Sequence, residues 1–548
     1  MIAIYGYRPV QRWTYRSIPG PPPRWLTGNL SEITRLSYAM FYLKYARKYG
    51  KVWKVWFGSR VVVLVMDPDL GRLVNRNPNR HAYPHLGDLK SAADNASFFS
   101  SITTARDHNL HRSLQSAWQP TLSSASLAGY APAMNAAAER LVACLGAVAA
   151  ANGETDMLAR FFRVAVDVVG TAVFGVDMHA QDDDDGPAAK RSTALVTAMQ
   201  TLMDIEYGAR SRYLTAGALF PFAFPLLRAL VNIFPDNAIR RICSSYVILR
   251  GTCEEVLGDI KAKLAAAAPP ASPAAALAGA GPLPKAAKPK SSGAGSVAMM
   301  PQAAVPDGGD AAQVPTPPGG FIPHLLSSAH HAGVRGGALL SDDEVLQQAM
   351  SFLVGTPEST AAAMSFCVHC LASHSAAEAA LLQEVDAFGR ARVPSAEDLA
   401  GLPYLDAVWT EALRLYGPGV SILREAAHDQ RIGGHFIPKG TALQTVICAI
   451  HRDPAIWPRA GEFVPERWLA GHAAEVTDAQ RRAFNPWGDG ARACIGRRFA
   501  AEEGRIVLLR LYQQFTFELL PGQVPLELWS PFSIKPRHGL FVRPRVRA

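Results

Sequence analysis

Apolar positions recur at helical spacing over most of the chain. Helical patterns are predicted over 38–49, over 107–264 and over 321–417. An alternating run over 52–66 predicts strand structure, and further strand-and-loop patterns follow residue 417 until a final helix begins at Gly496. The pattern therefore predicts a mainly α fold with a small β region.

The hydrophobic pattern is interrupted once, over 265–320. The composition there falls to Ala, Pro, Gly, Ser and a few Lys, with too few large apolar residues to anchor a core. We interpret 265–320 as a disordered insertion within one large domain. Residues 18–264 and 321–548 then form the two parts of that domain, and residues 1–17 are an N-terminal segment of uncertain role.

Two segments bear on membrane contact. Residues 1–17 fall far short of the roughly 20 apolar residues that a spanning helix needs, and they fit a transit peptide and a truncated start equally well. Residues 218–235 are very apolar but are interrupted by Pro221, Pro225 and Arg228, so they do not span a bilayer as a regular helix. This second segment could lie against a membrane or form a buried helix–loop–helix.

Composition narrows the class of protein. The chain of 548 residues is 49% hydrophobic, which is ample for a large core, and its net charge is +9. No zinc-finger spacing or aromatic-interleaved basic stripe accompanies that charge, so nucleic-acid binding is set aside. The seven cysteines are sparse and odd in number, which favours reduced thiols, and Cys367 and Cys370 are expected to be core thiols.

One cysteine stands in a distinctive loop, Phe484-Asn-Pro-Trp-Gly-Asp-Gly-Ala-Arg-Ala-Cys-Ile-Gly496. Gly488 and Gly490 allow a tight turn and a close approach to a flat ligand. Backbone N–H groups around Cys494, with the helix that starts after it, would stabilise a thiolate. One thiolate does not hold zinc or an iron–sulfur cluster, but it can be the axial ligand of a haem.

This loop resembles the cysteine loop of the cytochrome P450 family, with Trp487 where the family usually has Phe. Other elements match in order. Glu411-Ala-Leu-Arg414 is similar to the family's ExxR, Pro465-Glu-Arg467-Trp468 to its PERF segment, and His451-Arg-Asp-Pro454 falls between them. The resemblance implies a structural Glu411–Arg414–Arg467 cluster behind a haem b that lies between the central helix and the cysteine loop.

The central helix departs from the family pattern. Ser341 and Glu344 form a capping box at its start, and Gly355-Thr-Pro-Glu-Ser-Thr360 stands where the family has its oxygen-activation segment. Pro357 would kink the helix at the expected dioxygen pocket. Glu358 and Ser359 are the candidate catalytic acid and alcohol for proton delivery.

Further basic residues match the family by register. Arg492, Arg424 and Arg112 are candidates to bind the haem propionates, with His108 as a weaker one. Four more arginines flank the loop and could form a docking face for an acidic electron-transfer partner: Arg481, Arg482, Arg497 and Arg498.

The resemblance implies a haem-dependent monooxygenase that uses dioxygen and oxidises a lipophilic small molecule. Electrons would come from a separate NADPH-dependent flavin reductase or a ferredoxin, since no such module is present in this chain. Peripheral attachment to the endoplasmic reticulum is the expected location, with a plastid as the alternative. Two other functions stay open: a haem-thiolate isomerase or dehydratase that acts on a peroxide, and a haem-binding sensor or carrier without turnover.

Overall fold

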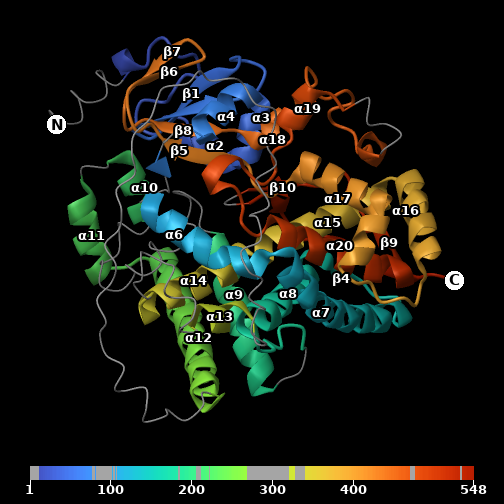
Figure 1. Cartoon of the computed structure of the whole chain (residues 1–548). Helices are drawn as coiled ribbons and strands as arrows, with labels where there is room; N and C mark the ends of the chain where they lie inside the picture. Colours follow the sequence, from blue (N-terminus) through green and yellow to red (C-terminus); the bar gives the residue numbers. More distant parts are fainter. Residues whose placement is uncertain are drawn as a thin grey trace, which may run out of the picture.

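The computed structural model describes residues 12–76, 80–81, 102, 105, 108–182, 186–204, 211–220, 223–267, 320–326, 340–469, 476–530 and 533–548. Helices dominate these residues, and the strands form only small sheets, so the predicted fold class is confirmed (Figure 1). The predicted insertion over 265–320 lies outside the described residues, apart from 265–267 and 320. Residues 265–267 continue a helix that was expected to stop at 264.

The helices follow one another along most of the chain. They are α2 Leu30–Leu36, α3 Tyr38–Tyr45, α4 Pro68–Arg76, α6 His108–Trp118, α7 Ser124–Ala150, α8 Met157–Val169, α9 Pro187–Met203, α10 Arg212–Leu219, α11 Phe224–Ile233, α12 Asn237–Ala267, α13 Phe321–Leu326, α14 Asp342–Gly355, α15 Pro357–Ser373, α16 Ser375–Phe388, α17 Pro403–Tyr416, α18 Ile447–Ile450, α19 Asp478–Ala483 and α20 Arg497–Gln514.

The strands gather mainly at one end of the molecule, at the top of Figure 1 beside α2, α3 and α4. They are β1 Val52–Phe57, β2 Arg60–Val65, β3 Arg80–His81, β4 Thr155–Asp156, β5 Ile422–Glu425, β6 Gln430–Ile432, β7 His435–Ile437, β8 Ala442–Thr445, β9 Phe515–Leu519, β10 Leu528–Trp529, β11 Lys535–Pro536 and β12 Phe541–Val546. The largest sheet has the order β1-β2-β8-β5-β3, the next has β4-β12-β9, and β6–β7 and β10–β11 are two-stranded.

The strand run predicted over 52–66 is a hairpin instead of one strand. β1 and β2 pair antiparallel, with Phe57 opposite Arg60, and the chain reverses at Gly58, whose φ is +62°. Alternation alone did not show the turn, because the apolar pattern resumes directly after two residues. Glycine permits this left-handed conformation without steric cost.

The central helix is built from α14 and α15, which cross the middle of the molecule (Figure 1). Every residue of α15 from Thr360 to Leu371 is buried, and α15 packs against α8, α17 and α20. The predicted capping box at Ser341 and Glu344 is present. Cys367 and Cys370 are buried in this helix, as expected of core thiols, and burial raises the pKa of each.

The apolar segment over 218–235 forms parts of α10 and α11. Val231 is buried, whereas Leu226, Ile233 and Phe234 are more than 60% exposed. This face is therefore unlike a buried helix–loop–helix, and the membrane-contact alternative is favoured. Among the described helices, α7 has the length and composition to cross a membrane; it packs against α20 and α8, and 28% of its most apolar stretch is buried.

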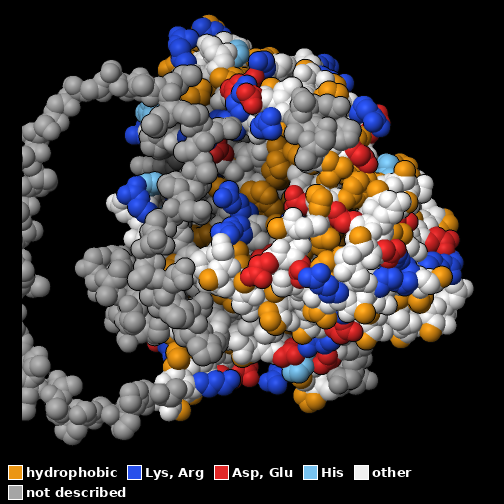
Figure 2. Space-filling view, turned by 45° about the vertical axis from the view of Figure 1, so that its right-hand side comes forward, with side chains coloured by type: hydrophobic (Ala, Val, Ile, Leu, Met, Phe, Trp, Pro, Cys, Tyr) orange, Lys and Arg blue, Asp and Glu red, His pale blue; other side chains and the backbone are white. Residues whose placement is uncertain are grey.

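The surface carries both signs of charge. Figure 2 shows basic and acidic side chains interspersed over the face that it presents. Many of them are paired at short range, for example Arg547 with Asp386 at 2.8 Å and Arg545 with Glu518 at 2.7 Å. Because basic and acidic groups are mixed and often paired, the net charge of +9 does not by itself mark a functional surface.

We predict that Glu503 of α20 makes stability depend on pH. Its side chain is fully buried, neither carboxylate oxygen has a hydrogen-bond partner among the described residues, and burial raises its pKa to about 8. A raised pKa favours the folded state at low pH, and that contribution is lost as the pH rises toward 8. In the parent, the free energy of unfolding should fall by up to about 1.4 kcal/mol for each unit of rising pH, and Glu503→Gln should abolish this fall.

The measurement is the thermal midpoint of both proteins between pH 5 and about pH 8, the pKa of Glu503. The thermal midpoint of the Gln variant should rise relative to that of the parent as the pH increases. Two parallel curves would show that Glu503 is already ionised in the folded protein.

Candidate functional site

A buried ionic cluster lies beneath the cysteine loop. Arg414 donates to both carboxylate oxygens of Glu411, with Nε to Oε2 at 2.9 Å and Nη2 to Oε1 at 2.8 Å. Arg467 Nε donates to Oε1 at 3.0 Å from the 3₁₀ turn η9 (Pro465–Trp468). The side chains of Glu411 and Arg414 are fully buried. The structure therefore brings together the three residues that the sequence predicted as one cluster.

Trp468 joins this cluster, which sequence reasoning missed. Its indole Nε1–H donates to Glu411 Oε2 at 2.8 Å, and the backbone N–H of Val464 donates to Oε1 at 3.0 Å. A phenylalanine could not make the first bond. The departure Pro465-Glu-Arg-Trp468 was visible in the sequence, and the extra N–H donor was the signal that could have revealed it.

Arg414 also connects the cluster to the cysteine loop through His451. Its Nη1 donates to the carbonyl oxygen of His451 at 2.8 Å, and the backbone N–H of Asn485 donates to His451 Nε2 at 2.9 Å. Burial and then the charge of Arg414 lower the pKa of His451 to about 3. The imidazole therefore stays neutral and can accept this bond at the start of the loop.

The loop itself turns on two glycines and one backbone bond. The N–H of Cys494 donates to the carbonyl oxygen of Trp487 at 2.7 Å. Gly488 has φ +77° and Gly490 has φ +76°, and a Cβ at Gly490 would lie 3.3 Å from the carbonyl oxygen of Asn75. Both predicted glycines are thus required by conformation, and the second also by the close approach of α4.

Asp489 fastens α4 to the loop, a contact that the sequence did not predict. Its carboxylate accepts from Arg76 Nε at 3.0 Å and Nη2 at 3.1 Å, and Arg72 Nε lies 3.9 Å away. It also accepts the N–H of Gly490 at 2.7 Å. These contacts hold the 3₁₀ turn η11 (Gly490–Arg492) against a helix more than 400 residues away in sequence.

Cys494 is the exposed one of the seven cysteines. Its thiol nevertheless has many protein atoms around it, and this desolvation raises its pKa, partly offset by the N–H of Gly496 and the charge of Arg497. A side chain that is accessible and yet closely surrounded is typical of the wall of a concavity. The backbone donor and the start of α20 are placed to stabilise a thiolate once a cation binds it.

Three basic side chains converge near the loop: Arg424 of β5, Arg492 of η11 and His111 of α6. Arg424 is buried, and its pKa is lowered to about 10 by burial and then by the charge of Arg492. The pKa of His111 is lowered to about 4 by burial, then by Arg492, His108 and Arg424. An anionic group among these three would relieve their repulsion.

The other two candidates on α6 are more exposed. Arg112 and His108 lie one helical turn apart, and Arg112 Nη2 is 2.9 Å from His108 Nε2. His111, between them in sequence, is the side chain that faces Arg424 and Arg492. Sequence matching could not choose it, because only the helical phase set by the fold turns His111 inward.

This donor set fits haem b. Cys494 provides one soft ligand, and the described residues hold no group of three or more His, Cys, Asp or Glu that could bind a metal instead. The neighbouring Arg424, Arg492 and His111 suit two propionates. The site thus offers one thiolate that could bind the haem iron and a basic cluster that could bind the haem carboxylates.

Glu358 and Ser359 lie directly after the break in the central helix. α14 ends at Gly355 and α15 begins at Pro357, so the helix is interrupted at the position where this proline was expected to kink it. Ser359 Oγ donates to the carbonyl oxygens of Gly355 and Thr356, both at 3.2 Å. The carboxylate of Glu358 is 2% exposed, and burial raises its pKa.

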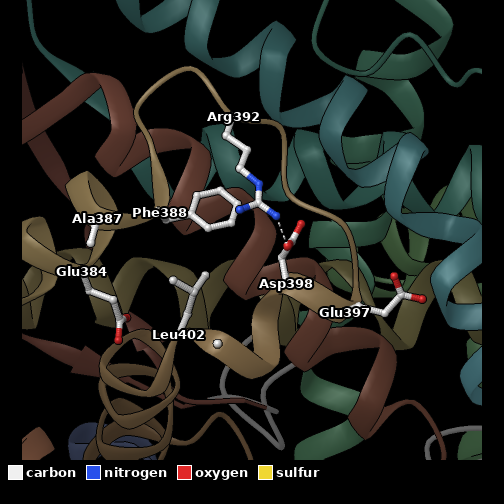
Figure 3. A pocket seen from close by; sticks show the side chains of 8 residues that line it. Glu384, Ala387, Phe388, Arg392, Glu397, Asp398 and Leu402 are labelled. Carbon is white, nitrogen blue, oxygen red and sulfur yellow. Dashed lines mark hydrogen bonds and ion pairs between the residues drawn. The ribbon is translucent and has the colours of Figure 1, made fainter.

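A separate cavity of about 440 Å³ lies between the end of α16, the start of α17 and the 3₁₀ turn η8 (Glu397–Gly401). Figure 3 shows Arg392 beside the ring of Phe388 and paired with Asp398, while Glu384 points away toward α17. Glu384 accepts the N–H groups of Tyr404 and Leu405. Arg392, Asp398 and Glu384 thus bond to other groups of the protein around the cavity. None of the predicted site residues lines this cavity.

Comparisons with known proteins point in the same direction as the geometry. The family model "Cytochrome P450" matches residues 18–243 and 315–541. The chain is similar to cytochrome P450 3A6 of Oryctolagus cuniculus, at 25% identity over 99% of this chain and 94% of the relative. It is also similar to thromboxane-A synthase of Sus scrofa, at 28% identity over the same shares. Thromboxane-A synthase of Mus musculus matches at 38% identity over 37% of this chain and 38% of the relative.

We predict that Glu411→Gln destabilises the fold by about 3–5 kcal/mol, because it leaves two buried guanidinium groups without their carboxylate. The matched control is Glu462→Gln. Glu462 also pairs with an arginine three residues away, Arg459 at 2.6 Å, but both side chains are more than half exposed. That change should cost less than about 1 kcal/mol. Urea unfolding followed by tryptophan fluorescence measures both, and equal losses would contradict a special role for the buried cluster.

Proposed function

The chain belongs to the cytochrome P450 family, and from this premise we propose that it is a monooxygenase that inserts one atom of dioxygen into a lipophilic small molecule. The observation that carries the proposal is the placement of Cys494, an accessible thiol on a fixed loop next to a basic cluster. Haem b with dioxygen is the cofactor chemistry of this family. When bound, the haem supplies the oxidising centre, and a thiolate ligand favours O–O cleavage.

The protein's own residues have separable roles in this proposal. Cys494 would bind the iron, and the N–H of Gly496 beside its sulfur would moderate how much charge the thiolate donates. Arg424, Arg492 and His111 would hold the haem propionates, with the more exposed Arg112 and His108 beside them. The carboxyl group of Glu358 and the hydroxyl group of Ser359 would hold the protons that the reduction of dioxygen consumes.

Electrons would come from a separate reductase, a flavoprotein or a ferredoxin. Arg497 is exposed in the first turn of α20, directly after the loop, and Arg481 is about half exposed. Arg482 is partly neutralised by Asp69 at 3.0 Å, and Arg498 donates to Ser124. Arg481 also has an acidic neighbour, Asp478 at 3.5 Å, so Arg497 is the candidate best placed to attract an acidic partner.

Membrane contact is supported by two sets of exposed apolar side chains. One lies on and after α11, with Leu226, Ile233 and Phe234, and the other is N-terminal, with Trp13 and Trp25. Such groups favour the boundary of a bilayer. We propose peripheral attachment to the endoplasmic reticulum membrane, with a plastid membrane as the alternative location.

A haem-thiolate isomerase that rearranges a peroxide is the second candidate. The relatives named thromboxane-A synthase favour it, as do Thr356 and Pro357 in place of the usual residues of the central helix. The presence of both Glu358 and Ser359 favours the monooxygenase. A sensor or carrier, the third candidate, would need neither residue. Dioxygen uptake driven by NADPH and a reductase separates the first candidate from the others.

We predict that carbon monoxide shifts the Soret band of the reduced protein strongly to the red, and that Cys494→Ala abolishes this shift. The reason is that only a thiolate ligand donates enough charge to produce it. Cys144→Ala, which changes a half-buried thiol of α7, is the matched control and should keep the shift. A band typical of histidine-ligated haem in the parent would exclude both the monooxygenase and the isomerase.

We predict that Arg497→Glu weakens the functional encounter with the reductase. Since the attraction is between exposed charges, the variant should raise the reductase concentration needed for half-maximal electron transfer and flatten its dependence on salt. Lys263→Glu is the control, because Lys263 is exposed near the end of α12, a helix at the opposite side of the molecule from α19 (Figure 1). Stopped-flow reduction at several salt concentrations measures the effect, and identical behaviour of the two variants would place the docking face elsewhere.

A further inference from the structure

Helix α4 is bonded directly to the cysteine loop by a pair of charged side chains. The carboxylate of Asp489 accepts two bonds from Arg76, from Nε at 3.0 Å and from Nη2 at 3.1 Å. The side chain of Asp489 is 18% exposed, whereas that of Arg76 is 60% exposed. Two parallel bonds between a guanidinium and a carboxylate fix direction as well as distance. The pair therefore holds the loop in one orientation relative to α4.

The same part of the chain also contacts the sheet that carries Arg424. β3 follows α4 and pairs antiparallel with β5, with the backbone of His81 opposite that of Arg424. In α4, Asn75 is buried, and its side-chain oxygen accepts the hydroxyl of Thr445 in β8 at 3.4 Å. β8 is in turn a neighbour of β5. α4 and β3 thus contact both the cysteine loop and the strand that holds Arg424.

Asp489 also caps the turn η11. Its carboxylate accepts the N–H of Gly490 at 2.7 Å, and the N–H of Ala493 donates to the carbonyl oxygen of Gly490 at 3.0 Å. The turn ends at Arg492, shortly before Cys494. Because glycines give this loop many conformations when it is free, a shift of Asp489 would move the turn and both of these side chains with it.

We propose that Arg76 and Asp489 are positioning residues for the haem. Their ion pair fixes the place of η11, and therefore of Arg492 and Cys494, relative to the strand of Arg424. It thereby sets how firmly the cofactor is held. Arg76 and Asp489 act through η11 and not by touching the haem. The proposal rests on haem binding at Cys494 as proposed above, but not on the reaction that follows.

An ordinary surface ion pair would contribute little, and it would act on the stability of the fold alone. The same helix offers one for comparison. Arg482 Nε lies 3.0 Å from Oδ1 of Asp69, which is in the first turn of α4. Both side chains are more than a third exposed, and Arg482 stands outside the cysteine loop. Losing this pair also removes an ion pair from α4, but it leaves Asp489 and η11 unchanged.

The first measurement is the rate at which the ferric holoenzyme loses its haem to an excess of apomyoglobin, followed by the Soret band without turnover. Arg76→Gln should speed this loss by about 10-fold, because the supporting contacts of a metal site typically contribute that much to its affinity. Arg482→Gln should stay within about twofold of the parent. Equal rates in the two variants would overturn the proposal.

A double-mutant cycle tests whether the two residues act as one. Asp489→Asn keeps an oxygen for the N–H of Gly490 but loses the charge that Arg76 binds, so it should speed haem loss as Arg76→Gln does. The double variant should then be no faster than either single variant, because one contact can be lost only once. Effects that multiply would show that the two residues act independently, and the pair would not be the positioning contact.

The carbon monoxide complex of the reduced holoenzyme separates this proposal from the one above. In Arg76→Gln a smaller fraction of the bound haem should give the red-shifted band, while Arg482→Gln should match the parent. A parent without that band would overturn haem binding at Cys494, and the positioning role with it. A parent with the band, and an Arg76→Gln variant that matches it in band and in haem loss, would overturn the positioning role alone. Should Asp489→Asn fail to fold, the comparison of Arg76→Gln with Arg482→Gln still decides, since both change partly exposed side chains.

Discussion

The structure depends on one buried carboxylate, Glu411. It accepts bonds from the side chains of Arg414, Arg467 and Trp468 and from one backbone N–H, and its own side chain is fully buried. A buried ion is costly unless its hydrogen bonds are complete, so these partners have to stay in place together. Since they come from α17 and from η9, about fifty residues later, the carboxylate fixes how two distant parts of the chain meet.

Glu411 also helps to fix the cysteine loop, because its partner Arg414 bonds to backbone carbonyl groups that lie next to the loop. Arg414 holds the carbonyl groups of His451, Ala460 and Glu462, and the neutral imidazole of His451 accepts the N–H that opens the cysteine loop. A loop rich in glycine has many conformations when it is free. The network restricts that freedom, and Cys494 is presented in one place.

The sequence predicted the mainly α fold, the cysteine loop and the Glu411 cluster, because each is local or carries a specific spacing. It did not predict the turn at Gly58, because an alternating pattern continues on both sides of a two-residue reversal. It also chose Arg112 and His108 where the fold turns His111 inward. Contacts such as Arg76 with Asp489 join residues too far apart for any pattern along the chain to show.

The break in the central helix shows how a departure from a family pattern can be compensated. Pro357 lacks an N–H and takes the first position of α15, where that group would have no helical partner. The hydroxyl of Ser359 then bonds two carbonyl groups of the turn before it. Glu358 faces the other way, toward Ser533 and Lys535. The proline therefore separates α14 from α15, and it leaves an acid and an alcohol side by side with different partners.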